Sequence, residues 1–201
     1  MEKKTHVMCA NFVSLCLMRP SSISSLLVTC SVSTLGALVP DVDLKDSTSD
    51  KLFDRLMTSL ITIVIMSVFI KYFFDIDLYC KIKECSYINY LVSICLFIVM
   101  AYLGSKSSHR SFTHSILGLF VYTAILSYGF GSSVIVPYFI SHLSHIILDL
   151  FNKKGVGIFY PSKFRVCFKL CESNGKVNRF LFILFSLLVV IVLVLISMGI
   201  L

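Results

Sequence analysis

The sequence predicts an all-α membrane protein with several spanning helices, on the basis of its composition and the spacing of its apolar residues. Hydrophobic residues make up 57% of the 201 residues and charged residues only 14%, and the mean hydropathy is +0.89. A soluble domain carries about 25% charged residues. The apolar residues also form seven separate runs, with Lys and Arg mostly between them. These observations indicate a polytopic helical membrane protein.

Each apolar run is a candidate helix. The runs are residues 7–18, 22–39, 56–74, 87–103, 114–130, 134–151 and 180–201. Because about 20 helical residues cross about 30 Å of hydrocarbon, most of the runs are long enough, or nearly so, to span a bilayer. The first run is short, so the sequence leaves open whether it spans, and we expect about six to seven apolar helices. Residues 1–178 are predicted to form a membrane-embedded domain and residues 179–201 a C-terminal transmembrane helix.

The first two runs differ in character. Residues 7–18 follow two lysines but are not followed by a small-residue cleavage site, so we expect this segment to be retained. Residues 22–39 are rich in small side chains, including Gly36 and Ala37, which allow membrane helices to pack closely. Pro40 should end this second helix.

The orientation in the membrane follows from the Lys and Arg residues. Residues 152–179 contain seven of them against a single acidic residue, Glu172, so this segment should be cytoplasmic. Counting spans backwards places residues 106–110, residues 41–55 and the N-terminus on the same side. The net charge of +7 then reflects orientation and contact with anionic lipid headgroups, and no nucleic-acid partner is expected.

Histidines and aspartates lie at the ends of the apolar runs, and the predicted topology places them at the same cytoplasmic face. The candidates are His6, Asp41, Asp43, His109, His114, His145 and Asp149. Charge bias and metal-ligand chemistry are independent criteria, and both select this face. We therefore predict one composite site there.

The strongest local pattern is on the predicted helix 134–151. His145 and Asp149 are four residues apart and share a helical face, and His142, three and seven residues away from them, joins the same stripe. Ionisable side chains within a membrane helix are costly unless they are paired or coordinated, so they are functional candidates. The alternative is a cluster at the helix end that faces water.

The heptapeptide 109–115 adds two more histidines. His109 and His114 would diverge on a continuous helix, but they converge if His109 lies in a loop and Ser111 caps a helix whose first turn carries His114. Arg110 would then offer a positive fork to an anionic oxygen, or it would serve only as a cytoplasmic anchor.

The aspartates that follow Pro40 are the remaining carboxylates. Asp41 and Asp43 flank Val42, and in a turn both could reach one or two cations. Imidazole and carboxylate ligands together favour Zn, Mn or Fe over Mg or Ca. Seven candidates exceed the ligands of one ion, so we expect one or two divalent ions, with Zn or Mn favoured.

The eight cysteines show no Cys-x-x-Cys motif and no regular spacing, so we interpret them as small buried hydrophobes. Cys167 and Cys171 are four residues apart and could share a helical face as metal ligands. Packing, or a chance surface pair, is the simpler interpretation.

Five motifs resemble one known family. They are Thr5-His6, Pro40 to Asp43, His109 to Ser115, Leu143 to Asp149 followed by Gly155-Val156, and Tyr160-Pro161. They resemble the membrane-bound, metal-dependent hydrolases also described as LexA-binding, inner-membrane-associated hydrolases, over residues 5–165. Leu44 departs from the histidine often found there in that family. The resemblance implies a remote relation to the helical fold of zinc-dependent phospholipase C and single-strand nucleases, and hence phosphoester chemistry.

The sequence thus predicts a metal-dependent hydrolase of the cytoplasmic membrane that acts on a phosphoester or lipid-linked substrate through a metal-activated water. Asp149 or Asp43 would be the general base if it is not a ligand, and Arg110 would stabilise developing negative charge. One alternative is a non-catalytic membrane protein with a metal-binding, transport or structural role. The other is that the polar residues only cap helices.

Overall fold

The computed structural model describes residues 1–43, 87–108, 110–172 and 175–200, and in this part of the chain the protein is all-α. The α-helices are α1 (Lys3–Met18), α2 (Ile23–Leu38), α5 (Tyr87–Ser105), α6 (Ile116–Gly129), α7 (Ser132–Leu150) and α8 (Lys176–Ser197). Two short 3-10 helices, η1 (Val39–Asp43) and η2 (Phe112–His114), follow α2 and precede α6. The apolar run 56–74 lies outside the described residues.

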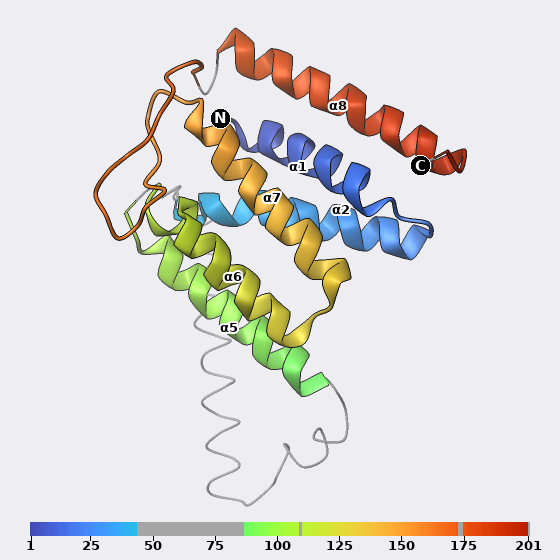
Figure 1. The fold of residues 1–201 in the computed structure, drawn as a ribbon, viewed down its shortest axis with the longest axis horizontal. Coiled ribbons are helices and arrows are strands. Elements are labelled where there is room, and N and C mark those ends of the chain that lie inside the picture. Colours follow the sequence, from blue (N-terminus) through green and yellow to red (C-terminus); the bar gives the residue numbers. More distant parts are fainter. Residues whose placement is uncertain (44–86, 109, 173–174, 201) are drawn as a thin grey trace, which may run out of the picture.

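Helix α7 is the centre of the bundle. It packs against α1, α2 and α6, while α5 packs on α6 and α8 lies along α1 (Figure 1). Its buried face includes Tyr138, His142, His145 and Asp149, spaced by three or four residues as on one side of a helix. Helix α7 therefore buries the ionisable side chains of His142, His145 and Asp149 at the centre of the bundle.

Small residues bring α2 and α7 close together, as the sequence predicts. A Cβ on Gly36 would lie 2.8 Å from both the Cβ of Ser141 and the carbonyl oxygen of Tyr138. The hydroxyl of Ser141 lies 3.0 Å from that of Ser33 and 3.1 Å from that of Ser14. Buried hydroxyls that bond one another need no water, which suits a helix interface within lipid.

Four helical segments are long and apolar enough to cross a membrane: Ile23–Val42, Ile88–Ser105, Ser132–Leu150 and Lys176–Ser197. The last of these has only 6% of its residues buried, and it presents Phe180, Leu187 and Val190 outward. An apolar helix that is exposed in this way needs lipid around it. The multispanning membrane class predicted from composition is thus supported.

The remaining helices are shorter. Helix α1 has 16 residues and begins at Lys3, four residues before the apolar run at residue 7, and α6 has 14 residues. Both fall short of the roughly 20 residues that a perpendicular crossing needs.

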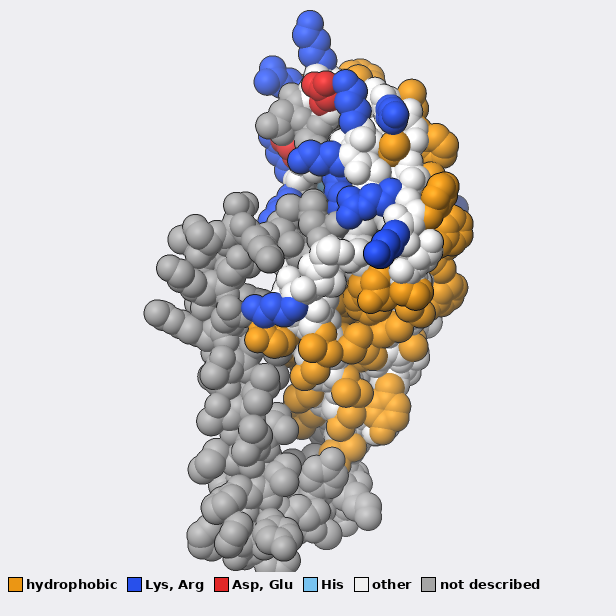
Figure 2. Space-filling model, turned by 90° about the vertical axis from the view of Figure 1, so that its left-hand side faces the viewer, with side chains coloured by type: hydrophobic (Ala, Val, Ile, Leu, Met, Phe, Trp, Pro, Cys, Tyr) orange, Lys and Arg blue, Asp and Glu red, His pale blue; other side chains and the backbone are white. Residues whose placement is uncertain are grey.

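Several helix ends meet at one end of the bundle. The start of α1, the ends of α2 and α7 and the start of α6 lie there, together with the segment 151–172 that follows α7 (Figure 1). Figure 2 views this end and shows Lys and Arg gathered in its upper part, with hydrophobic side chains below them. The helix ends that carry the predicted polar residues are therefore neighbours of the most basic segment.

Candidate metal centre

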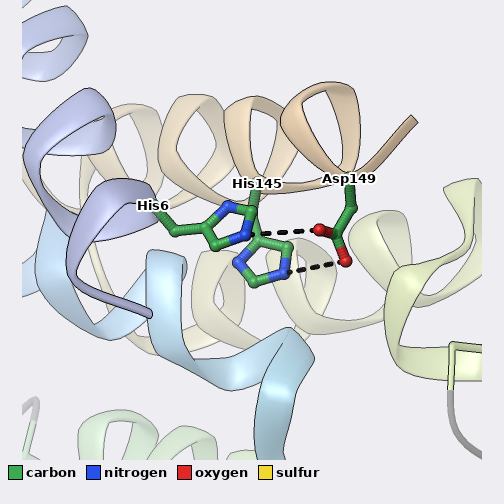
Figure 3. A group of neighbouring side chains, drawn as sticks. All are labelled: His6, His145 and Asp149. Carbon is green, nitrogen blue, oxygen red and sulfur yellow. Dashed lines mark ion pairs between the residues drawn. The ribbon is translucent and has the colours of Figure 1, made fainter. Parts of the chain in front are cut away.

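Five ionisable side chains from four parts of the chain meet in the interior at this end of the bundle. Two groups of three have potential ligand atoms that all lie within 4.8 Å of one another: His6, His145 and Asp149, and Asp41, His114 and His145. All five side chains are buried. Figure 3 shows the first group, with His6 from α1 facing the pair from α7.

His145 belongs to both groups, and its orientation is set by the backbone. Its Nδ1 lies 2.7 Å from the carbonyl oxygen of Ala37 in the last turn of α2. A carbonyl oxygen can only accept, so Nδ1 carries the proton and Nε2 carries the lone pair. This Nε2 is buried without a hydrogen bond among the described residues. Histidines that bind metals are held by this kind of outer contact.

His6 lies flat against His145. The two ring centroids are 3.7 Å apart and the planes are inclined by 14°. The ring is almost completely buried, and burial favours the neutral imidazole, which has a lone pair for a ligand. Neither of its ring nitrogens has a hydrogen bond within the described part of the chain, although Nε2 lies 3.4 Å from Oδ1 of Asp149.

Asp149 is the carboxylate around which the positive groups gather. The amino group of Met1 donates to its Oδ1 at 2.6 Å, and Nη2 of Arg110 lies 2.9 Å from its Oδ2. Nε2 of His114 lies 3.5 Å from the same Oδ2. A buried carboxylate needs such compensation, since an isolated one would be strongly destabilising.

Asp41 completes the second group from the short helix η1. Its Oδ1 lies 3.7 Å from Nε2 of His114 and 3.7 Å from Nε2 of His145. The side chain is at the border of the interior, with 9% exposure, and it lies within the 3-10 helix that follows α2. Asp41 is thus placed between two histidines that come from different elements.

The spacing of these atoms fits a metal centre. Ligand atoms of a tetrahedral zinc with bonds of about 2.0 to 2.1 Å lie about 3.3 Å apart. The closest contacts between imidazole nitrogens and carboxylate oxygens in the two groups are 3.4 to 4.0 Å. Small side-chain adjustments would therefore close either group on one ion. Nitrogen and carboxylate donors without thiolate suit Zn or Mn.

Arg110 is drawn into the interior instead of reaching outward as an anchor. It is 5% exposed, pairs with Asp149, and has a positive φ of 59°. Its carbonyl oxygen accepts the backbone N–H of Gly157 at 2.9 Å. The bond from Gly157 and the pairing with Asp149 thus hold Arg110 in this uncommon backbone conformation.

The local capping differs from the prediction in one respect. Ser111 precedes η2 but makes no side-chain cap bond, whereas Ser115 has extended backbone angles and accepts the N–H of Gly118 at 2.9 Å. Ser115 therefore caps α6, and His114 lies just before that helix, in η2. The extra turn lets His114 point inward before the helix begins.

Three other predicted or nearby residues have different outcomes. His109 lies outside the described residues, and only the backbone of Asp43 is described, at the end of η1. His142 does not join His145: its Nε2 donates to the carbonyl oxygen of Thr113 at 2.9 Å, and its Nδ1 lies 3.2 Å from the hydroxyl of Tyr138. Both ring nitrogens of His142 are thus used within the protein.

The two cysteines singled out from the sequence lie in the segment between α7 and α8 and not on a helix. The Sγ of the buried Cys171 donates to the carbonyl oxygen of Phe151 at 3.3 Å. The groups of potential metal ligands found among the described residues do not include Cys167 or Cys171. Packing therefore accounts for Cys171.

Two contacts of the candidate centre cannot be predicted from sequence motifs. The Ala37 carbonyl that orients His145 is a backbone group, so its residue type carries no signal beyond the rule that the last carbonyls of a helix lack helical partners. The Met1 amino group that meets Asp149 likewise depends on how α1 docks against α7.

The comparisons with known proteins agree with the membrane architecture. A family model described as "YdjM inner membrane protein" matches residues 1–200. No curated protein and no solved structure matches the chain. Since the family match covers nearly every residue, and the chain carries four apolar helices able to span a bilayer, the protein belongs to the YdjM inner membrane protein family.

Proposed function

We propose that this protein is a metal-dependent hydrolase of the cytoplasmic membrane, with Zn or Mn at a site that faces the cytoplasm. The observation that carries the proposal is the burial of His6, His145 and Asp149 together at the end of an apolar bundle. Burying ionisable groups is costly unless they are paired or coordinate a cation. Helix capping alone would leave these groups exposed to water, so it does not explain their burial.

The proposed ligand set is drawn from the residues that the sequence singles out. Those with described side chains are His6, Asp41, His114, His145 and Asp149, and Asp43 and His109 are further candidates. Two groups that share His145 allow one ion or two. When bound, the metal would supply a water that is acidic enough to form hydroxide near neutral pH.

The protein's own groups would position the substrate and handle protons. Asp149, or Asp43, would accept a proton from the attacking water if it is not itself a ligand. The Arg110 guanidinium, held 2.9 Å from Asp149, would stabilise negative charge that develops on a substrate oxygen. Because Arg110 is almost fully buried, its charge would act in a medium of low dielectric constant, where it is strongest.

A lipid or lipid-linked phosphoester is the proposed substrate class. The described residues line an open apolar cavity of about 660 Å³ that reaches Val39 and Val42, on either side of Asp41. A hydrocarbon chain could lie in this cavity while its polar head reaches the centre. A remote relation to the phospholipase C fold, which the sequence motifs imply, belongs to the same proposal.

The cytoplasmic orientation is supported by the basic segment at the site end of the bundle. Lys153, Lys163 and Arg165 lie in the segment between α7 and α8, beside the helix ends that form the centre (Figure 1). By the positive-inside rule this end faces the cytoplasm. A site at one end of the bundle also counts against transport, because transporters place their sites near the middle of the membrane.

The test is metal analysis of the detergent-purified protein by mass spectrometry, followed by a phosphoester substrate screen. The expected result is about one or two equivalents of Zn or Mn in the parent, in line with the donor set, and loss of both metal and turnover in His145→Ala. A folded parent that takes up no metal after reconstitution overturns the proposal. Metal without turnover on phosphoesters would instead favour the non-catalytic alternative.

A further inference from the structure

Arg110 also borders a second cavity, which is separate from the apolar one. This polar cavity has a volume of about 440 Å³. Its lining includes the cationic residues Arg110, Lys163 and Arg165 and the hydroxyl-bearing residues Ser108, Ser111 and Ser162. Among the described residues, its lining contains no Asp or Glu. A cavity whose described wall has three cationic residues and no carboxylate favours an anion.

The backbone builds this cavity from two distant segments. The N–H of Gly157 donates to the carbonyl oxygen of Arg110 at 2.9 Å, and the N–H of Ile116 donates to that of Ile158 at 3.1 Å. These bonds hold residues 157–158 against the turn that carries Arg110. A Cβ on Gly157 would lie 3.1 Å from the Arg110 carbonyl oxygen, so glycine permits this close approach.

A second pair of backbone bonds fixes the position of Arg165. Val156 and Val166 exchange N–H to carbonyl bonds of 2.9 Å in both directions. Arg165 precedes Val166 directly, so this pairing keeps it beside the segment that contacts Arg110. Backbone hydrogen bonds therefore fix the two segments that form the cavity wall.

We infer that this cavity binds a phosphate group of the substrate, with Lys163 and Arg165 as binding residues beyond the metal centre. The inference rests on the proposed function and specifies its substrate as an anionic, phosphate-bearing molecule. Phosphate offers several acceptor oxygens, and guanidinium, ammonium and hydroxyl groups are its usual donors. Arg110 lines the polar cavity and also pairs with Asp149 of the candidate metal centre. It therefore connects the proposed phosphate site to that centre.

The test is a calorimetric titration of the full chain in uncharged detergent with inorganic phosphate. Lys163→Gln/Arg165→Gln should weaken phosphate binding roughly tenfold or more, since each charge-assisted bond that is lost reduces affinity substantially. The matched control is Lys153→Gln/Lys154→Gln, which removes two charges from the same segment but outside the cavity. It should bind phosphate as the parent does. Equal affinity in the parent and the cavity variant overturns the inference.

A second arm distinguishes a lipid headgroup from free phosphate. Dihexanoyl phosphatidic acid carries the same phosphate on a short-chain lipid, so tighter binding than inorganic phosphate identifies a lipid source, and equal binding a soluble one. Either result supports the cavity if the double variant weakens it. A His145→Ala variant should lose metal but keep phosphate binding, so the metal proposal can fail while the cavity stands. Loss of phosphate binding in a folded His145→Ala variant would overturn the inference that phosphate binds in this cavity independently of the metal centre.

Discussion

The ring of His6 in α1 stacks on the ring of His145 in α7, with centroids 3.7 Å apart and planes inclined by 14°. Each ring therefore shields one face of the other from water while Nε2 of His6 approaches Asp149 (Figure 3). The docking of α1 against α7 is thus part of the candidate centre, and helix packing and metal binding should be coupled.

Replacing His6 with alanine should test this coupling. We expect metal affinity to fall about tenfold or more, in the range seen when a ligand or its orienting partner is lost. The measurement is metal content after dialysis against a graded chelator. Lys4→Ala is the matched control, because Lys4 is exposed in the same turn and contacts Glu2 and the Phe182 ring, which are not among the candidate ligands. Retention of full metal affinity in a folded His6→Ala variant would remove His6 from the centre.

His142 should behave as a structural histidine. Both of its ring nitrogens are engaged, with the Thr113 carbonyl and the Tyr138 hydroxyl. His142→Gln should therefore keep the parent's metal content while losing about 1 to 3 kcal/mol of stability, the cost of leaving a buried polar group unsatisfied. Metal analysis and thermal unfolding in detergent measure the two effects. Loss of metal from a stable His142→Gln variant would contradict this assignment.

Gly36 should be intolerant of a larger side chain. Alanine would place its Cβ 2.8 Å from Ser141 and from the Tyr138 carbonyl, so α2 would have to move away from α7. We expect a destabilisation of about 1 to 3 kcal/mol, as for overpacked cores. Because Ala37 orients His145 from the same helix, metal affinity should fall as well. The exposed Ser31→Ala in α2 is the control, and both variants are compared by thermal unfolding with and without added Zn.

Arg110 should matter for turnover more than for metal retention. It pairs with Asp149 through one nitrogen and is not itself a metal ligand. With a substrate from the phosphoester screen, Arg110→Gln should lower kcat by about a hundredfold, the scale for loss of one donor to a developing negative charge. Arg179→Gln, exposed at the start of α8, is the charge-matched control. A kcat equal to the parent's would exclude this role.

Much of the architecture follows from local pattern. Runs of apolar residues predict helices α2, α5, α6, α7 and α8 to within a few residues, because a backbone in lipid must satisfy its own hydrogen bonds. The separation of His145 from Asp149 predicts a shared face, since helical geometry acts over four residues. The small residues around Gly36 likewise predict close packing, and the structure shows it.

Local sequence pattern is less informative where two residues could take the same role, or where one side chain has a choice of partners. The sequence predicts Ser111 as the helix cap, but Ser115 takes that role, because both serines offer a capping hydroxyl and spacing alone does not select one of them. The sequence also groups His142 with His145 because of their spacing. The hydroxyl of Tyr138 and the Thr113 carbonyl draw His142 to a different partner.

Composition and helical periodicity thus determined the membrane class, the approximate bounds of five described helices and the position of polar residues at helix ends, because these depend on interactions within one segment or with the bilayer. Only the tertiary structure decided which side chains meet. His6 on His145, Asp41 between two histidines, and Arg110 turned inward against Asp149 all depend on how separate helices dock, and docking is set by the shapes of whole packed surfaces.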